Sequence, residues 1–229
     1  MNNYSQLEEI IKIKFNNQDL LKQSMVHRSY LNEHSDFKLD HNERLEFLGD
    51  AVLELVVTEY LYLNYKNPEG DLTNWRASLV NSTMLATVAN ELKLDDFLYL
   101  SKGESKDTNG KARQYILANA MEALIGAIYL DQGWAISDNF IKNNILIKLD
   151  NILKNKLYLD PKSRFQESSQ EKQGITPSYR VLTEDGPDHN KKFVLGVYLN
   201  DELVAKGEGT SKQEAQMDAA EKALEVKGW

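Results

Sequence analysis

The first 152 residues carry apolar side chains at intervals of three and four, and this periodicity limits the fold more than any other feature. It runs through LEEIIKIKF, LEFLGDAVLELVVTEYLYLNY, LVNSTMLATVANEL and ILANAMEALIGAIYLDQGW. Such spacing places apolar groups on one face of an α-helix. Two stretches, NPEGD (67–71) and SKGESKDTNGK (101–111), have the composition of turns and should interrupt the helices. We therefore expect an all-α helical domain over residues 1–154.

The pattern changes after residue 155. KNKLYLDPKS is typical of a short connection, and SRFQESSQEKQG predicts a helix that ends at its glycine. PSYRVLTEDG, KKFVLGVYLN and ELVAKGEGT have strand character, and a last helix should begin after Thr210 or Ser211 and end near Gly228. This order predicts a linker over residues 155–160 and a small α+β domain (α-β-β-β-α) over residues 161–229.

Composition limits the chemistry and the partners. The chain has no cysteine, which excludes disulfides and thiolate metal sites, so any metal must be held by oxygen or imidazole ligands. The N-terminus lacks the apolar region of a signal peptide, and no run reaches the roughly 20 apolar residues of a membrane span. We therefore expect a cytoplasmic protein without a membrane partner. The net charge of −8 argues against a generally basic nucleic-acid binder.

A row of acidic residues stands in the segment HNERLEFLGDAVLEL (41–55). Glu43, Glu46 and Asp50 are spaced three and then four apart, which places them on one helical face, where like charges repel. Such a row is ordinarily a solvated helix face. Here the acids are interleaved with apolar residues, and Gly49 costs a helix interior about 1 kcal/mol relative to alanine. The glycine indicates that another part of a molecule approaches the helix closely.

Several motifs together resemble the ribonuclease III family over the whole chain. NERLEFLGDAVL (42–53) is similar to the family's signature, and HRSYLNE (27–33), EGDLTNWRASLVN (69–81) and EALIGAIYLDQG (122–133) are similar to its other helical motifs. The C-terminal segment resembles a double-stranded-RNA-binding domain. A twelve-residue match followed by ordered companion motifs is far more specific than one short motif.

The resemblance implies an activity. Members of this family are endoribonucleases that cleave double-stranded RNA by metal-dependent phosphodiester hydrolysis. The products carry 5′-phosphates, 3′-hydroxyls and two-nucleotide 3′ overhangs, and the substrates include ribosomal RNA precursors and structured messenger RNAs. The implied cofactor is Mg²⁺, for which Mn²⁺ can substitute, and no small-molecule cofactor is expected.

The family's metal-binding acids match particular positions of this chain. The resemblance assigns metal binding to Glu46, Asp50, Asn119 and Glu122, and catalytic roles to Asp50, Glu122, Glu46 and Glu43. Glu43 matches the first signature glutamate, which lies near the scissile strand in the family. Two divalent ions held by such carboxylates would activate water and compensate the charge that develops on the phosphate. Glu54 lies beyond the match, and we expect an ordinary surface role for it.

Asn119 departs from the family pattern, in which an aspartate precedes the glutamate of the second acidic helix by three residues. An asparagine side chain offers a carbonyl oxygen but no charge. The departure is compatible with weaker metal binding that is offset elsewhere, with a substitution that traps uncut RNA, or with loss of catalysis. Two alternatives to an active nuclease follow, namely a catalytically impaired double-stranded-RNA-binding protein and a ribosome-associated structural protein. The three intact acids favour the enzyme.

Phe47 and Gly49 are candidates for a dimer interface. An aromatic residue in such a helix is ordinarily part of the core. In the ribonuclease III family the corresponding aromatic packs across a homodimer axis where the signature helices meet. The resemblance therefore implies a homodimer that places two active sites across one RNA minor groove.

The histidines close to the acidic helix do not indicate a catalytic base. His27 and His41 have neither the spacing of a histidine metal motif nor a serine and aspartate arranged with them as a triad. We expect them to cap helices or to accept hydrogen bonds.

The resemblance also assigns RNA contacts to the C-terminal domain. Domains of this type recognise the shape of A-form RNA through two minor grooves and the phosphates between them. The matching positions are Gln166 and Glu167 in the first helix, His189, Lys191 and Lys192 in the hairpin, and Ser211 and Lys212 at the last helix. Residues 160–229 contain 10 lysines and arginines and 13 aspartates and glutamates, a net charge of −3. We therefore expect weak RNA affinity from this domain alone.

Overall fold

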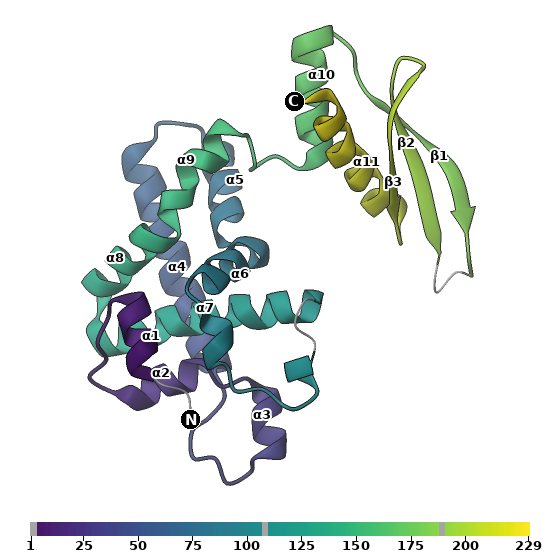
Figure 1. Cartoon of the computed structure of the whole chain (residues 1–229). Helices are drawn as coiled ribbons and strands as arrows, with labels where there is room; N and C mark the ends of the chain where they lie inside the picture. The colour runs from purple at the N-terminus through teal and green to yellow at the C-terminus, as the bar shows by residue number, and fades with distance from the viewer. Residues whose placement is uncertain (1–3, 107–109, 188–190) are drawn as a thin grey trace. The chain divides into compact units, whose positions relative to one another are not determined.

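The computed structural model describes residues 4–106, 110–187 and 191–229. The chain divides into two compact units, Met1–Lys154 and Asn155–Trp229. The first is helical, and the second combines helices with a sheet (Figure 1). No helix among the residues described is long and apolar enough to cross a membrane.

The helices of the first unit follow the predicted periodicity. They are α1 (Tyr4–Ile11), α2 (Gln18–Ser24), α3 (Arg28–Glu33), α4 (Glu43–Asn64), α5 (Glu69–Val80), α6 (Ser82–Glu91), α7 (Lys111–Gln132), α8 (Trp134–Asn144) and α9 (Leu149–Lys154). Short 3₁₀ turns lie at Leu94–Phe97, Glu104–Lys106 and Leu146–Lys148. The turn predicted at residues 67–71 is shorter than expected, because α5 already begins at Glu69, directly after Pro68. Proline fits there because it needs no backbone donor at a helix start.

Helix α7 forms the centre of the helical unit. It packs against α2, α4, α6 and α8, and its most extensive contact is with α4. Figure 1 shows α4 and α7 crossing in the middle of this unit. The buried residues of these two helices are mostly apolar, and they include Leu45, Val52, Leu53, Met121, Leu124, Ile125 and Ile128. Burial of this apolar surface is the main stabilising contribution to the unit.

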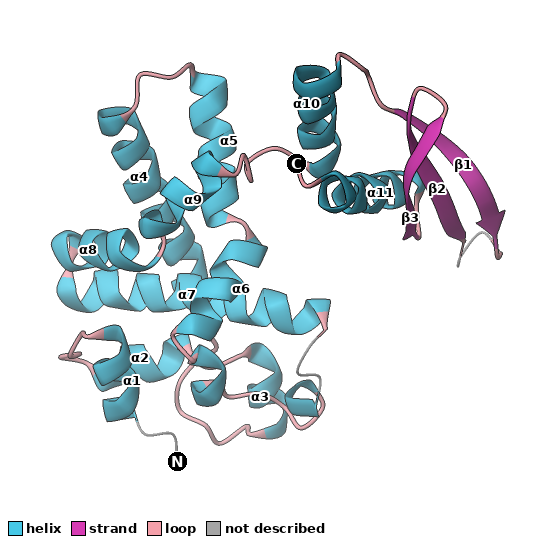
Figure 2. Cartoon of the chain, turned by 45° about the horizontal axis from the view of Figure 1, so that its top comes forward, coloured by secondary structure: helices cyan, strands magenta, loops and turns pink. Residues whose placement is uncertain are grey.

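The second unit is a three-stranded antiparallel sheet with two helices on one face (Figure 2). Its elements are α10 (Pro161–Gln173), β1 (Ser178–Asp185), β2 (Lys192–Leu199), β3 (Glu202–Gly209) and α11 (Lys212–Lys227). Phe165 of α10 packs with Val197 and Leu199 of β2 and with the alanines of α11. Gly174 ends α10 with a φ of 70°, a conformation that glycine adopts without strain.

The predicted fold class is therefore confirmed in both parts. Ser211 is the N-cap of α11, because its side-chain oxygen accepts a hydrogen bond from the Glu214 backbone at 3.1 Å. Gly228 follows the last turn of this helix with a φ of 65°. The connection between the two units, residues 155–160, has no regular secondary structure.

Candidate active site and nucleic-acid interface

The start of α4 is fixed by a buried asparagine. The Asn42 side chain donates a hydrogen bond to the Ser24 carbonyl at 3.2 Å, and its backbone N–H donates to the Val26 carbonyl at 2.9 Å. Asn42 is almost fully buried, so these bonds are shielded from water. They hold the first turn of α4, which carries Glu43 and Glu46, in a fixed position.

Two glycines allow α4 and α7 to touch through their backbones. A Cβ atom on Gly49 would lie 1.7 Å from the Glu122 carbonyl oxygen, and one on Gly126 would lie 2.2 Å from the Leu45 carbonyl oxygen. The close approach indicated by the mid-helix glycine is therefore confirmed, but its neighbour is α7 of the same chain. The assignment of Gly49 to a dimer interface is wrong, because this residue is buried within one chain.

This crossing brings three predicted metal ligands into electrostatic contact. Burial, followed by the charges of Asp50 and Glu46, raises the pKa of Glu122 to about 7. Burial also raises the pKa of Glu46, with smaller contributions from Glu43 and Asp50. Asp50 itself is exposed. The site therefore concentrates negative charge, part of it away from solvent, and a cation would relieve the repulsion.

Asn119 lies one helical turn before Glu122 on α7 and is half-buried. The acids and this asparagine offer hard oxygen donors, which is the donor set that Mg²⁺ prefers. Within residues 4–106, 110–187 and 191–229, no three histidine, aspartate or glutamate side chains are arranged to hold a metal ion. The carboxylates repel one another, which favours side-chain positions that keep them apart. The donor types and the raised pKa of Glu122 nevertheless fit a divalent cation.

Glu43 has basic neighbours of its own. Its carboxylate lies 3.5 Å from the Arg28 guanidinium and 3.7 Å from the Nδ1 atom of His41. His27 caps α3, because its Nδ1 atom accepts a hydrogen bond from the Ser29 backbone at 3.3 Å. Burial lowers the pKa of His27, which favours the neutral, accepting form. The structural role predicted for His27 is therefore confirmed.

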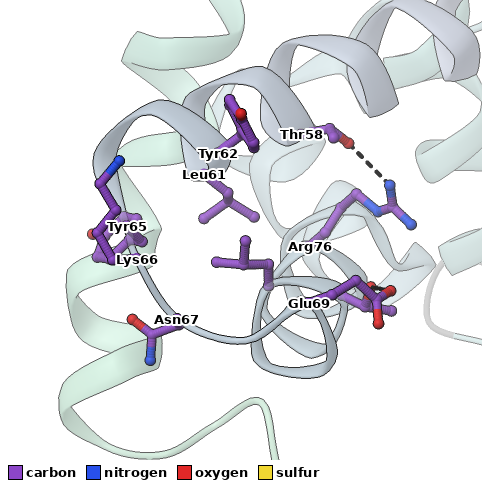
Figure 3. Close-up of a pocket in the computed structure, with 10 residues that line it drawn as sticks. Thr58, Leu61, Tyr62, Tyr65, Lys66, Asn67, Glu69 and Arg76 are labelled. Carbon is purple, nitrogen blue, oxygen red and sulfur yellow. Dashed lines mark hydrogen bonds between the residues drawn. The ribbon is translucent and has the colours of Figure 1, made fainter.

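A cleft of about 530 Å³ lies between the end of α4 and the start of α5, away from the predicted ligands (Figure 3). Arg76 lies at its edge and donates a hydrogen bond to the Thr58 hydroxyl at 3.0 Å. The same guanidinium lies 3.0 Å from the Glu54 carboxylate, so Glu54 has an ion-pair partner within the helical unit. None of the predicted site residues lines this cleft.

Phe47 lies on the outer side of α4, where 82% of its side chain is exposed. It helps to line a hollow of about 620 Å³, together with leucines such as Leu20 and Leu130 and with charged residues such as Arg44. The expectation that such an aromatic is ordinarily a core residue does not hold here. An exposed phenylalanine among leucines, with polar residues around them, is typical of a surface that is covered by another molecule.

In the second unit, α10 turns its predicted contact residues outward. Phe165 is fully buried, whereas Gln166 and Glu167, which follow it, are exposed. Glu167 lies 3.3 Å from the Lys156 ammonium. The start of α10 lies beside α11, because the Lys162 ammonium donates a hydrogen bond to the Gln216 side chain at 2.6 Å.

The predicted hairpin and helix lysines lie close together. Lys191 precedes β2, Lys192 is its exposed first residue, and Lys212 is the exposed first residue of α11. The Lys212 ammonium lies over the Phe193 ring, 5.7 Å from its centroid. His189 lies outside the described residues.

One residue of this cluster was not predicted from the sequence. The Glu184 carboxylate accepts a hydrogen bond from Lys191 at 2.9 Å and lies 3.7 Å from Lys212. These contacts depend on the pairing of β1 with β2, in which Glu184 stands opposite Phe193. The sequence shows an acidic residue before a turn, but the strand register that brings it to both lysines is visible only in the structure.

Two family models match the chain. The Ribonuclease-III-like model covers residues 17–149, and the double-stranded RNA binding motif covers residues 161–227. The first match contains all of the predicted metal ligands, and the second contains all of the predicted RNA contacts.

Relatives named Ribonuclease 3 are similar over nearly their full length. The protein from Enterococcus faecalis is 43% identical over 222 residues, which are 96% of this chain and 95% of the relative. The protein from Carboxydothermus hydrogenoformans is 44% identical over 225 residues, which are 98% of this chain and 95% of the relative.

Solved structures are similar to the helical unit. The nuclease domain of ribonuclease III from Campylobacter jejuni aligns with a TM-score of 0.57 at 41% identity, over 65% of this chain and 97% of that domain. A second structure of that domain, with a TM-score of 0.56 at 41% identity, covers 63% of this chain and 99% of that one. It describes structural flexibility in the region involved in dimer formation.

Proposed function

Because the chain belongs to the ribonuclease III family and is an endoribonuclease that cleaves double-stranded RNA, we propose that Glu46, Asp50 and Glu122 hold the divalent metal ions of this hydrolysis. The observation that carries the proposal is the pKa of Glu122. It rises to about 7 because the carboxyl group is buried and faces Asp50 and Glu46. A carboxyl cluster of this kind, at a crossing of two helices, is suited to a cation.

The proposed cation is Mg²⁺, with Mn²⁺ as a substitute, because carboxylate and amide oxygens are the ligands these ions prefer. When bound, divalent ions supply a nucleophilic hydroxide and compensate charge on the phosphate and the leaving oxygen. The chain's own contribution is to position the ligands. Glu46 and Asp50 lie one turn apart on α4, and Glu122 faces them from α7 across the Gly49 contact. Asn119 contributes an uncharged amide oxygen.

Glu43 has a separate proposed role at the edge of this site. It lies on the same face of α4 as Glu46 and close to Arg28. We assign it to the approach of the scissile strand, with Arg28 compensating its charge. Hydrolysis at a site of this type leaves 5′-phosphate and 3′-hydroxyl ends. Two such sites across a minor groove would give two-nucleotide 3′ overhangs, as in the processing of ribosomal RNA precursors and messenger RNAs.

We propose that the residues 161–229 form the RNA-binding domain and that 155–160 are the linker. Gln166 and Glu167 are exposed on α10, where they can reach minor-groove hydroxyls. Ser211 and Lys212 stand at the N-terminus of α11, where backbone N–H groups and the helix dipole favour a phosphate. Lys191 and Lys192 add positive charge from the hairpin, and His189 is assigned to the second minor groove by family resemblance.

We also propose that the chain forms a homodimer through the surface around Phe47. A two-fold dimer uses the same patch on both copies, so a protruding group and a hollow on one patch can fill each other. Phe47 is exposed at the edge of the hollow of about 620 Å³ that it helps to line, so one patch offers both features. The dimer-forming region of the Campylobacter jejuni nuclease domain supports the proposal.

Glu122→Gln tests the metal site. This change keeps the size of the side chain but removes a charged ligand, so cleavage of a long duplex RNA in magnesium should fall by roughly a thousandfold or more. Binding of the same duplex, measured by fluorescence anisotropy, should change less than threefold, because the RNA contacts lie elsewhere.

Glu9→Gln is the matched control, because Glu9 is an exposed acid on α1 and the charge change is the same. This variant should cleave at the parent rate. If Glu122→Gln lost duplex binding as strongly as cleavage, Glu122 would be architectural and not a metal ligand. If it kept cleavage, the proposed site would be wrong.

A further inference from the structure

Glu184 makes a contact that the proposed RNA surface does not require. Its Oε1 atom accepts a hydrogen bond from the Lys191 ammonium at 2.9 Å, and its Oε2 atom lies 3.7 Å from the Lys212 ammonium. One carboxylate on β1 thereby joins a lysine that precedes β2 to the first residue of α11. Both lysines are proposed phosphate contacts.

The position of this carboxylate is set by the fold. Glu184 stands opposite Phe193 in the antiparallel pairing of β1 and β2, next to the pair Asp185 and Lys192. Phe193 is buried, and the Lys212 ammonium lies 5.7 Å from the centroid of its ring. Strand register and the packing of Phe193 therefore hold the acid and both lysines at one end of the domain.

A carboxylate and a phosphate compete for the same ammonium groups, because both offer anionic oxygens to the same N–H donors. The hydrogen bond from Lys191 lowers the pKa of Glu184, so the carboxylate is ionised at neutral pH. RNA phosphates that reach Lys191 and Lys212 must therefore displace an anion that is already there. The net charge of −3 over residues 160–229 adds to this competition.

We propose that Glu184 limits the RNA affinity of the C-terminal domain by occupying Lys191 and Lys212 until phosphate displaces it. The inference rests on the proposed function, since it requires that the two lysines bind phosphate. Exposed ion pairs are weak, so the exchange is readily reversible and its effect is severalfold. The consequence is selectivity. The free energy lost when Glu184 is displaced is recovered only by a ligand that contacts several parts of the RNA-binding surface at once.

The test is Glu184→Gln in the full chain, with duplex RNA in EDTA so that metal-dependent cleavage does not intervene. Anisotropy titrations at 0.15 M salt should give roughly three- to tenfold tighter binding than the parent. The salt dependence of binding should be steeper than in the parent. In the parent, the displaced Glu184 carboxylate takes up a cation from solution when the lysines bind phosphate, and the glutamine of the variant does not.

Glu202→Gln is the control variant. Glu202 pairs with Lys227 at 3.1 Å, at the opposite end of α11, whose 16 residues span about 24 Å. The Glu202→Gln change removes the same charge from the same domain, far from Lys212, so RNA affinity should change less than twofold. If both variants gained RNA affinity equally, the effect would come from net charge alone, and the inference would be overturned.

A third variant, Lys191→Gln with Lys212→Gln, separates the inference from the proposed function. The RNA affinity of this double variant should weaken at least tenfold. Adding Glu184→Gln to it should change the affinity less than twofold, as in the Glu202→Gln control. Unchanged binding of the lysine variant would contradict the proposed phosphate contacts. A weakened lysine variant, together with no gain from Glu184→Gln alone, would overturn only the role of Glu184.

Discussion

Asn119 is the residue at which this chain departs from the ribonuclease III pattern of the proposed metal site. It stands one turn before Glu122 on α7, half-buried and without a charge. A neutral amide reduces repulsion in the metal-free site, but it also reduces attraction for a dication. If Asn119 lies in the proposed site, it lowers the affinity for metal and raises the stability of the metal-free protein.

Asn119→Asp should lower the magnesium concentration that gives half-maximal cleavage by several-fold, because a fourth carboxylate strengthens the attraction for the ion. The same change should lower the melting temperature in EDTA, because it adds a charge beside Glu122, whose pKa is already raised. Cleavage rates across a magnesium series and thermal melts with and without metal measure the two effects.

Asn139→Asp, on the exposed side of α8, is the control and should change neither quantity. An unaltered magnesium midpoint in Asn119→Asp would mean that residue 119 does not face the metal. A rise in its melting temperature without metal would contradict the electrostatic account of the site.

Individual site residues differ in how far the sequence predicts them. Glu46 and Asp50 could be placed on one helical face from their spacing alone, because helix geometry fixes residues four apart. The helix that packs against Gly49 could not be predicted, since nothing local in the sequence says which element approaches it. Glu184 was missed for the same reason, because its contact with Lys212 depends on strand register and helix packing.

At the scale of elements, the contact between α4 and α7 determines whether the site exists. Leu45 and Gly126 form one close approach, and Gly49 and Glu122 form the other. The acids of the two helices converge because the backbones touch between them. Any side chain at either glycine would separate the helices and, with them, the proposed ligands.

Gly49→Ala should destabilise the protein by about 3 kcal/mol, the upper range for overpacked core positions. Alanine favours a helix by about 1 kcal/mol relative to glycine, but its Cβ would meet the Glu122 carbonyl at 1.7 Å, and backbone cannot move aside cheaply. Urea denaturation measures the loss, and cleavage of duplex RNA should fall as well.

Gly70→Ala provides the comparison within the same unit. Gly70 lies in the first turn of α5, where an added Cβ meets nothing within 4 Å. The free energy of unfolding of the Gly70→Ala variant should stay the same or rise slightly, through helix propensity alone. If Gly49→Ala were equally neutral, the two helices would not be in backbone contact.

At the scale of the whole molecule, the order of elements could be predicted and their tertiary contacts could not. Apolar periodicity identified the helical part. Strand-like runs between a helix that ends at a glycine and a capped last helix identified the α+β part. These features are local, so they are readable from sequence. The central place of α7 is not local, because it depends on contacts with α2, α4, α6 and α8.

Assembly is the property of the whole molecule that most needs measurement. Phe47→Asp should convert the protein from a dimer to a monomer in sedimentation velocity runs at micromolar concentration, because a charge in an apolar interface is costly. Cleavage should then produce fewer paired cuts in the two strands.

Leu63→Asp is the matched substitution, since Leu63 is also exposed on α4 but lies four turns further along the helix. It should stay dimeric. A parent protein that sediments as a monomer would contradict the homodimer, and a dimeric Phe47→Asp variant would show that the interface lies elsewhere.

The buried carboxyl group of Glu122 links the site to the acidity of its surroundings. With a pKa of about 7, it holds a proton on roughly half of the metal-free molecules at neutral pH. A metal ion at the proposed site would bind the deprotonated form, so loading it would release that proton into the buffer. Proton and magnesium would then compete for the same carboxylate, and a fall in pH would weaken metal binding as a fall in magnesium concentration does. The enzyme would sense both quantities through one side chain.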